Sequence, residues 1–463
     1  MMEIRKWFSK QTSSETSIAP LVVFRILFGS MMFLSTLRFI SKGWVTDLYI
    51  TPNYFFTYLG FDWIKPLDEF GIYFLFGAIL ISSLLIALGL FYRLGAIVFF
   101  TAFTYIELLD KTNYLNHYYF ISLVAFLMMF LPANKKCALD VYFGFIGQKN
   151  KVAAWTVNII KFQLAVVYIF AGISKLNYEW LIEAQPLTNW LKHQTDLPLI
   201  GMFMKYEFTA YLFSWGGALF DLVIVFVLLN NRFRIYGYIM VVVFHGLTAA
   251  MFPIGVFPYV MILSTLIFFS DSFHNKIIQT IQKSIPNKLK KTAVASEELK
   301  NEQPKTYTNL LISMYIFIQV LVPLRYIMYP GKLFWTEQGY RFSWRVMLIE
   351  KVGYTQFYIH EPLGQGKKLI NNRQYLTPQQ EKMMSTQPDM ILQYAHFLRD
   401  EYSNRTFIEK NGKKIKLEVP KVTAEVYVSL FNKGSRLFID PEVNLSQIER
   451  GFSAKNWIKK YED

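Results

Sequence analysis

The chain of 463 residues contains only one cysteine, Cys137, and only six histidines. One cysteine cannot form an intrachain disulfide or a cysteine-based metal cluster, so the fold has neither kind of cross-link available. The histidines are scattered, with no HExxH sequence and no paired-carboxylate spacing, and we therefore predict no metal site. GxGxxG and P-loop patterns are also missing, which removes the usual sequence signatures of dinucleotide and nucleoside triphosphate binding.

Charged residues are also scarce. They make up 17% of the chain, against roughly 25% in soluble domains, whereas 53% of the residues are hydrophobic. Up to about residue 330, the hydrophobic residues form runs close to the ~20 residues that cross a bilayer. The sequence therefore predicts a polytopic α-helical membrane domain over residues 1–330. We place nine spans, at 19–40, 69–90, 94–110, 114–131, 153–174, 208–229, 233–251, 254–270 and 307–328.

The net charge of +15 comes largely from Lys and Arg residues in the loops between these spans. With the N-terminus inside, the inside loops are basic and the outside loops are mixed or nearly neutral. Membrane topology thus accounts for the charge, and we expect the lipid bilayer, not nucleic acid, as a partner. The polar N-terminus shows no cleavable signal peptide, so the first span is expected to be a retained anchor. An odd number of spans places the C-terminal domain outside the cell membrane.

The region 331–463 is predicted to be a water-facing, β-rich domain. It follows a polar linker at 283–305, and its charge density rises while the apolar runs stop. The Asn-Gly pair at 411–412 is typical of a hairpin turn, and AEVYVSLF and RLFID, joined by NKGS, predict two further strands. One helix is expected over Leu376–Tyr402, with Thr377 as its cap and a proline directly after the cap.

Polar side chains at the predicted spans are candidate functional residues, because an ionisable group in hydrocarbon is costly. They are Arg25, Glu107, Asp110, Asn116, His117, Lys175, Asp221 and His245. Each also has a structural interpretation. Arg25 and Asp221 can form an ion pair between helices, and Lys175 can extend from a helix end to the interface. The histidines can be hydrogen-bonded core residues, so these residues alone indicate a membrane enzyme or a transporter.

Seven segments, in order along nearly the whole chain, resemble the vitamin K-dependent gamma-carboxylase family. They are VFRILFG at 23–29, LDKTNYLNHYYF at 109–120, IFAGISKLNYEW at 169–180, FHGLTAAMFPIGVFPYVM at 244–261, GYRFSWRVML at 339–348, QPDMILQYAHFL at 387–398 and RLFIDPEVNL at 436–445. The resemblance implies a bacterial-type homologue whose membrane part is an HTTM domain. The segments lie in both predicted domains, so the resemblance covers the membrane part and the water-facing part together.

The family uses reduced vitamin K, of the menaquinol or phylloquinol type, with O₂ and CO₂ as co-substrates. A protein base deprotonates the hydroquinone, and its oxygenation to the epoxide generates a base strong enough to remove the γ-proton of glutamate. The resulting carbanion captures CO₂. Because such a base survives only where water is excluded, the resemblance implies a dry site within the bilayer. The implied partners are the quinone and a glutamate-containing peptide or protein.

The resemblance assigns roles to several of the candidate residues. Lys175, in the AG-x-x-KL pattern, would be the catalytic base, and it must be neutral to accept a proton. Asn116 and His117 would bind the quinone oxygens and stabilise the developing anion. Three further residues are assigned to the quinone slot: His245, Met251 and Phe257. Apart from the resemblance, we interpret three intramembrane charges as structural: Arg25, Asp110 and Asp221.

Two differences from the animal enzymes leave alternatives open. The animal enzymes link their two parts by a disulfide and extend further at the C-terminus, and a single cysteine excludes that link here. They also bind a propeptide, for which we identify no groove in this sequence. The alternatives are a quinone epoxidase without carboxylase activity, and a membrane protein that only binds quinone. A transporter is the third alternative, although we find none of the internal repeats that transporters commonly show.

Overall fold

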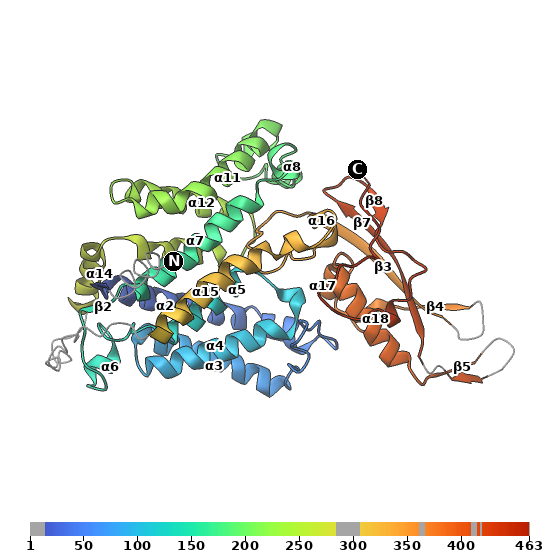
Figure 1. The fold of residues 1–463 in the computed structure, drawn as a ribbon, viewed down its shortest axis with the longest axis horizontal. Helices are drawn as coiled ribbons and strands as arrows, with labels where there is room; N and C mark the ends of the chain where they lie inside the picture. Colours follow the sequence, from blue (N-terminus) through green and yellow to red (C-terminus); the bar gives the residue numbers. More distant parts are fainter. Residues whose placement is uncertain (1–13, 284–305, 361–365, 409–413, 417–418, 463) are drawn as a thin grey trace.

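The computed structural model describes residues 14–283, 306–360, 366–408, 414–416 and 419–462. Within these residues, seven helices are long and apolar enough to cross a membrane. They are α2 (Ala19–Ser41), α3 (Glu69–Leu88), α4 (Tyr92–Leu109), α7 (Trp155–Ser174), α11 (Glu207–Leu229), α12 (Arg234–Met251) and α15 (Thr306–Leu324), which the 3-10 turn Arg325–Met328 continues. Figure 1 shows these helices gathered on one side of the molecule and the C-terminal strands on the other. The polytopic helical fold is therefore confirmed.

The predicted count of nine spans is not confirmed. The fourth predicted span contains α5 (Asn116–Met128), and the eighth contains α13 (Phe257–Thr265), which a 3-10 turn extends to Phe268. Both helices are shorter than the ~20 residues that cross a hydrocarbon core. Their short length separates them from the seven long helices, and the number of crossings stays a prediction.

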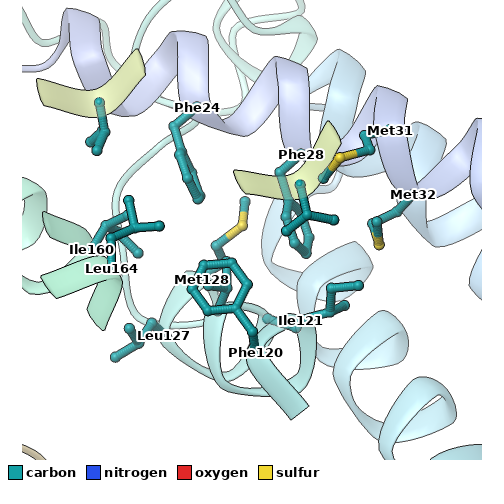
Figure 2. Close-up of a cluster of buried hydrophobic side chains, with 14 of the residues drawn as sticks. Phe24, Phe28, Met31, Met32, Phe120, Ile121, Leu127, Met128, Ile160 and Leu164 are labelled. Carbon is teal, nitrogen blue, oxygen red and sulfur yellow. The ribbon is translucent and has the colours of Figure 1, made fainter. Parts of the chain in front are cut away.

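The core of the helical part lies between α2, α5 and α7. Figure 2 shows Phe24 and Phe28 of α2 pointing toward Phe120 and Met128 of α5, with Ile160 of α7 beside them. Helix association inside a bilayer depends on close packing, because lipid tails are as apolar as the side chains. These large side chains are all buried, so they fix the arrangement of the three helices.

The two ends of the helical bundle carry different structures. At one end, strand β1 (Glu15–Ser17) pairs with strand β2 (Lys151–Ala153), which directly precedes α7. At the other end, the loops that follow α4 and α7 contact the C-terminal part: Asp110 accepts a hydrogen bond from Gln380, and Lys433 pairs with Glu183. These are loops that we predicted to lie on one common side. The predicted inside segment at residues 5–10 and the linker at 284–305 lie outside the described residues.

The C-terminal part is built on a four-stranded antiparallel sheet in the order β4-β3-β7-β8. Its strands are β3 (Lys351–His360), β4 (Lys367–Leu369), β7 (Lys421–Leu430) and β8 (Ser435–Leu437). Along β7, Val422, Ala424, Val426 and Val428 are fully buried, which is the period of two expected for one covered face. Helix α18 (Pro388–Tyr402) packs against this strand. The predicted pairing of AEVYVSLF with RLFID is confirmed as β7 with β8.

The single helix predicted over Leu376–Tyr402 was wrong. The chain forms α17 (Pro378–Met384) and then α18, with a break between them before Pro388. Proline lacks an N–H and disfavours a helical residue before it, so it begins a new helix. The predicted cap at Thr377 is confirmed, because its side chain accepts from the Gln380 amide at 3.3 Å.

Short strands also flank the predicted hairpin turn. Strand β5 (Thr406–Ile408) pairs with β6 (Lys414–Lys416), as the sequence indicated. The predicted turn at 411–412 lies outside the described residues. Nothing in the fold tests residue 330 as a domain boundary, which we keep as a proposal.

Candidate functional site

A buried ion pair joins α7 to α11. Lys175 caps the C-terminus of α7, and its Nζ lies 2.6 Å from Oδ2 of Asp221, near the middle of α11. Both side chains are only 7% exposed. The Lys175 ammonium also donates to the carbonyl of Ala171 at 3.4 Å. Lys175 is therefore held inside the protein, and it does not extend to a water interface.

The pair opens onto a cavity, and the empty space of about 740 Å³ in and around it includes the part that is open to solvent. Its lining is mostly apolar and aromatic: Val167, Tyr168, Ala171, Lys175, Trp180, Leu187, Phe213, Gly217, Asp221, Phe244, His245, Thr248, Met251, Phe252, Ile254, Phe257, Met261, Val346 and Met347. Four residues that we predicted for the site meet here, namely Lys175, His245, Met251 and Phe257. Asp221, predicted only as a structural charge, joins them.

His245 lines this cavity and has one ring nitrogen without a partner among the described residues. Its Nε2 lies 3.1 Å from the hydroxyl of Tyr168, while its buried Nδ1 has no hydrogen-bond partner among the described residues. The ring is also packed against Phe244 and Phe257. A buried polar atom without a partner is costly, and a ligand with a polar group can satisfy it. The lining is thus mostly apolar, with a few polar groups that a ligand could contact.

Two family models match the chain. The HTTM domain matches residues 14–273, more than half of the chain, and the lumenal domain of vitamin K-dependent gamma-carboxylase matches residues 304–463. The chain belongs to the vitamin K-dependent gamma-carboxylase family. No solved structure matches this carboxylase-family chain.

Two residues that the family resemblance assigned to quinone binding do not line the cavity of this gamma-carboxylase-like protein. His117 is buried beside Phe257, which lines the cavity, and the centroids of the two rings are 5.8 Å apart. Asn116 donates from Nδ2 to the carbonyl of Arg345 at 3.1 Å and accepts from the Tyr114 hydroxyl at 3.0 Å. Asn116 therefore holds the chain next to Val346, which does line the cavity.

The proposed pairing of Arg25 with Asp221 was wrong. The Arg25 guanidinium is fully buried and donates to the carbonyls of Ile86, Ala87 and Cys137 at 2.6–2.7 Å. The carbonyls of Ile86 and Ala87 lie at the C-terminal end of α3. The carbonyl of Cys137 lies in the loop that follows the fourth predicted span. Helix C-termini leave carbonyls unsatisfied, and a cation there is favourable. Arg25 therefore joins the helix ends near β2, while Asp221 has Lys175 as its partner.

Asp110 lies at the junction between the helical part and the C-terminal part of this carboxylase relative. It follows the last residue of α4, accepts from Gln380 of α17 at 2.7 Å and accepts from the backbone N–H of Thr112 at 2.9 Å. Its carboxylate is buried by contact with the sheet domain. A structural role is consistent with these bonds, at the edge of the helical bundle.

Sequence reasoning missed two aromatic residues that line this cavity, Trp180 and Tyr168. Trp180 places its ring 5.5 Å from the lysine Nζ and is fixed by its Nε1, which donates to the Ser214 carbonyl at 2.8 Å. Tyr168 orients His245. A signal was present for Tyr168, because it precedes Lys175 by two helical turns and so shares its helix face. Trp180 lies in the quoted IFAGISKLNYEW segment but had received no role.

Proposed function

We propose that this gamma-carboxylase-like protein couples oxygenation of reduced vitamin K to carboxylation of glutamate, with Lys175 as the base that starts the reaction. The observation that carries the proposal is the position of Lys175, buried at the end of α7, in an apolar cavity and 2.6 Å from Asp221. A lysine must lose its proton before it can act as a base. Asp221 is near enough to take that proton, which leaves a neutral amine at the cavity.

The quinol fits the lining residues. His245 offers an unpaired Nδ1 for an oxygen of the ring, while Phe257 and Met251 provide apolar contact surface. When a quinol is bound there, its oxidation by O₂ would supply the strong base that is needed to deprotonate glutamate. The residues of the chain bind and orient it, accept its first proton at Lys175, and exclude water from the cavity. We propose a menaquinol or phylloquinol type of quinol, with CO₂ as the second co-substrate.

We also propose a sidedness for the protein. The loop charges favour the N-terminus inside the cell membrane and the C-terminal part outside, where a glutamate-containing peptide or protein can reach it. A reporter fused after Asp463 should therefore respond as an external domain. A cytoplasmic response would contradict this orientation.

A direct assay tests the proposed chemistry. The purified full-length protein is incubated with phylloquinol, O₂, labelled bicarbonate and a glutamate peptide, and both the quinone epoxide and the peptide label are measured. Lys175→Ala should lower epoxide formation by about 100-fold or more, as expected when a general base is lost. Lys175→Arg should be nearly as damaging because a guanidinium stays protonated. Lys192→Ala removes an exposed lysine and serves as the matched control.

Each contrary result has a definite meaning. An arginine variant with near-normal turnover would end the assignment of Lys175 as the base. Epoxide formation without label in the peptide would indicate a quinone epoxidase. Quinone binding without epoxide in the wild-type protein would leave a binding function only.

A further inference from the structure

A second lysine of α7 lies far from the proposed reaction. Lys161 is within the first two turns of the helix, and Lys175 caps its other end, so roughly 20 Å of helix separates them. Lys161 is partly buried and forms no hydrogen bond or ion pair among the described residues. Its Nζ lies 6.0 Å from the centre of the Phe268 ring. A cation is therefore held against an aromatic ring at the end of the bundle that carries β1 and β2.

A second cation, Arg234, lies near this lysine. It is the first residue of α12, and its guanidinium donates to the carbonyls of Leu228 and Leu229 at 2.8 and 3.3 Å. These carbonyls belong to the last turn of α11, so the arginine is fixed at the junction of the two helices. Arg234 forms no ion pair among the described residues, yet it is close enough to Lys161 for their charges to interact. Two like charges are thus held near each other, which is unfavourable unless an anion joins them.

One carboxylate, Asp271, also interacts with Lys161, but it does not form an ion pair with it. Asp271 is the exposed first residue of α14 (Asp271–Lys283), which lies at the same end of the helical part as β2 (Figure 1). His274 fixes this first turn, because it is fully buried and its Nδ1 donates to the carbonyl of Ser270 at 2.9 Å. Burial lowers the pKa of His274, so its ring is mostly neutral at pH 7 and adds no charge. The group therefore has two cations and one solvent-exposed carboxylate.

An apolar stripe leads away from the two cations along α12. Ile235, Ile239 and Val242 are spaced by four and three residues, so they share one face of the helix. All three are exposed, at 51%, 53% and 39%. The stripe begins directly after Arg234, so a molecule with a charged head and an apolar tail would find both surfaces in register.

Aromatic side chains fix the position of α14 beside this stripe. The rings of Tyr238 in α12 and Phe269 are 5.1 Å apart, and Phe269 lies 4.6 Å from Phe273 in α14. On the other side of α14, Lys136 donates to Asn275 at 3.3 Å. The elements that carry the two cations are therefore held by contacts of their own, and the cations stay available for a ligand.

We propose that Lys161 and Arg234 together bind the phosphate of an anionic phospholipid, with an acyl chain along the apolar stripe of α12. The loop charges predict this end of the bundle to be inside, and basic sites between helices on that side typically bind anionic headgroups. A zwitterionic headgroup is disfavoured because its amine or choline would bring a third cation to the two already present. The site is separate from the Lys175 cavity, so it does not depend on the proposed reaction.

Lipid titration tests the inference. The full-length protein in a neutral detergent is titrated with phosphatidylglycerol or with phosphatidylcholine of the same acyl chains, and the first bound lipid is measured by native mass spectrometry. We expect phosphatidylglycerol to bind more tightly. Lys161→Gln should weaken its binding by roughly three- to tenfold, whereas Lys161→Arg should retain most of it because a guanidinium also pairs with phosphate. Lys276→Gln removes an exposed lysine of α14 and is the matched control, with the first binding step unchanged.

A second variant separates lipid binding from a lysine that merely extends toward water. Asp271→Asn removes the carboxylate that competes with the phosphate for Lys161, and the exposed position should tolerate the change. If a phosphate binds there, this variant should bind phosphatidylglycerol several-fold more tightly than the wild type. If Lys161 merely extends toward water, the affinity should not change.

Equal affinity for the two lipids would overturn the inference, as would equal effects of Lys161→Gln and Lys276→Gln. If Lys161→Gln does not fold, Asp271→Asn decides, and an affinity that is unchanged or weaker rejects the site. Inorganic phosphate is added as a competitor in a further titration. Displacement of the lipid by an equal concentration of phosphate, lost in Lys161→Arg or Lys161→Gln, would assign the two cations to a free anion and reject the lipid.

Discussion

At the scale of single residues, the Lys175–Asp221 pair makes the two side chains depend on each other. Lys175→Met leaves Asp221 as an unpaired carboxylate in an apolar interior, which costs about 3–5 kcal/mol of stability for a buried pair. The double variant Lys175→Met/Asp221→Leu removes both charges and should recover most of that loss. Thermal unfolding of the purified variants measures this. If the double variant were no more stable than Lys175→Met, the stabilities of the two side chains would not depend on each other.

The individual charges could be found from the sequence, but their partners could not. Lys175, Asp221 and Arg25 are each conspicuous within an apolar run. Which of them meet depends on which helices are neighbours and how each is rotated, and neither follows from hydropathy. Arg25 also satisfies backbone carbonyls, a kind of partner that leaves no trace in side-chain composition.

At the scale of elements, the approach of α7 to α11 depends on Gly172. A Cβ on this residue would lie 2.7 Å from Cγ and 2.9 Å from the backbone nitrogen of Leu222, the residue after Asp221. Gly172→Ala should therefore separate the helices, weaken the ion pair and destabilise the protein by about 1–3 kcal/mol. Gly216→Ala, in α11, meets nothing within 4 Å and is the matched control. Equal thermal stability of the two variants would contradict this role for Gly172.

Hydropathy predicted the long helices well because lipid imposes length and composition on any helix that crosses it. It was less informative for α5 and α13, which are short and are placed by packing. In the C-terminal part, the strands were predicted from alternating apolar and polar residues. The Thr377 cap was predicted because a proline directly follows it. The break before Pro388 was missed because helical spacing continues through it.

At the scale of the whole molecule, Asp389 links the helical part to the sheet domain, because it pairs with both Arg341 and Lys111 at 2.8 Å. Its pKa is lower in the folded protein than in the unfolded chain, so its stabilising contribution is present above the unfolded value and lost as pH falls. Asp389→Asn should lower stability at pH 7 by about 1 kcal/mol, because solvent screens this partly exposed side chain. The difference from the wild type should shrink below about pH 4. Thermal unfolding across this range checks the trend, and a difference that grows in acid would refute it.

A cavity with five cationic side chains, between the helical part and the C-terminal part, could not be predicted from the sequence. Its residues come from loops of the helical part and from three stretches of the C-terminal part, and they meet only when the two parts dock. Each cation by itself resembles an ordinary surface or loop charge. The excess of positive charge becomes visible only in the assembled molecule.

The apolar cavity takes Val346 and Met347 from the C-terminal part, which has a consequence for biosynthesis. Lys175 and Asp221 enter the membrane first, and at usual rates of translation roughly ten to thirty seconds pass between synthesis of Lys175 and of Val346. During that interval the helices are in place, but the cavity lacks part of its wall. The proposed site is therefore incomplete until the C-terminal part has also been made.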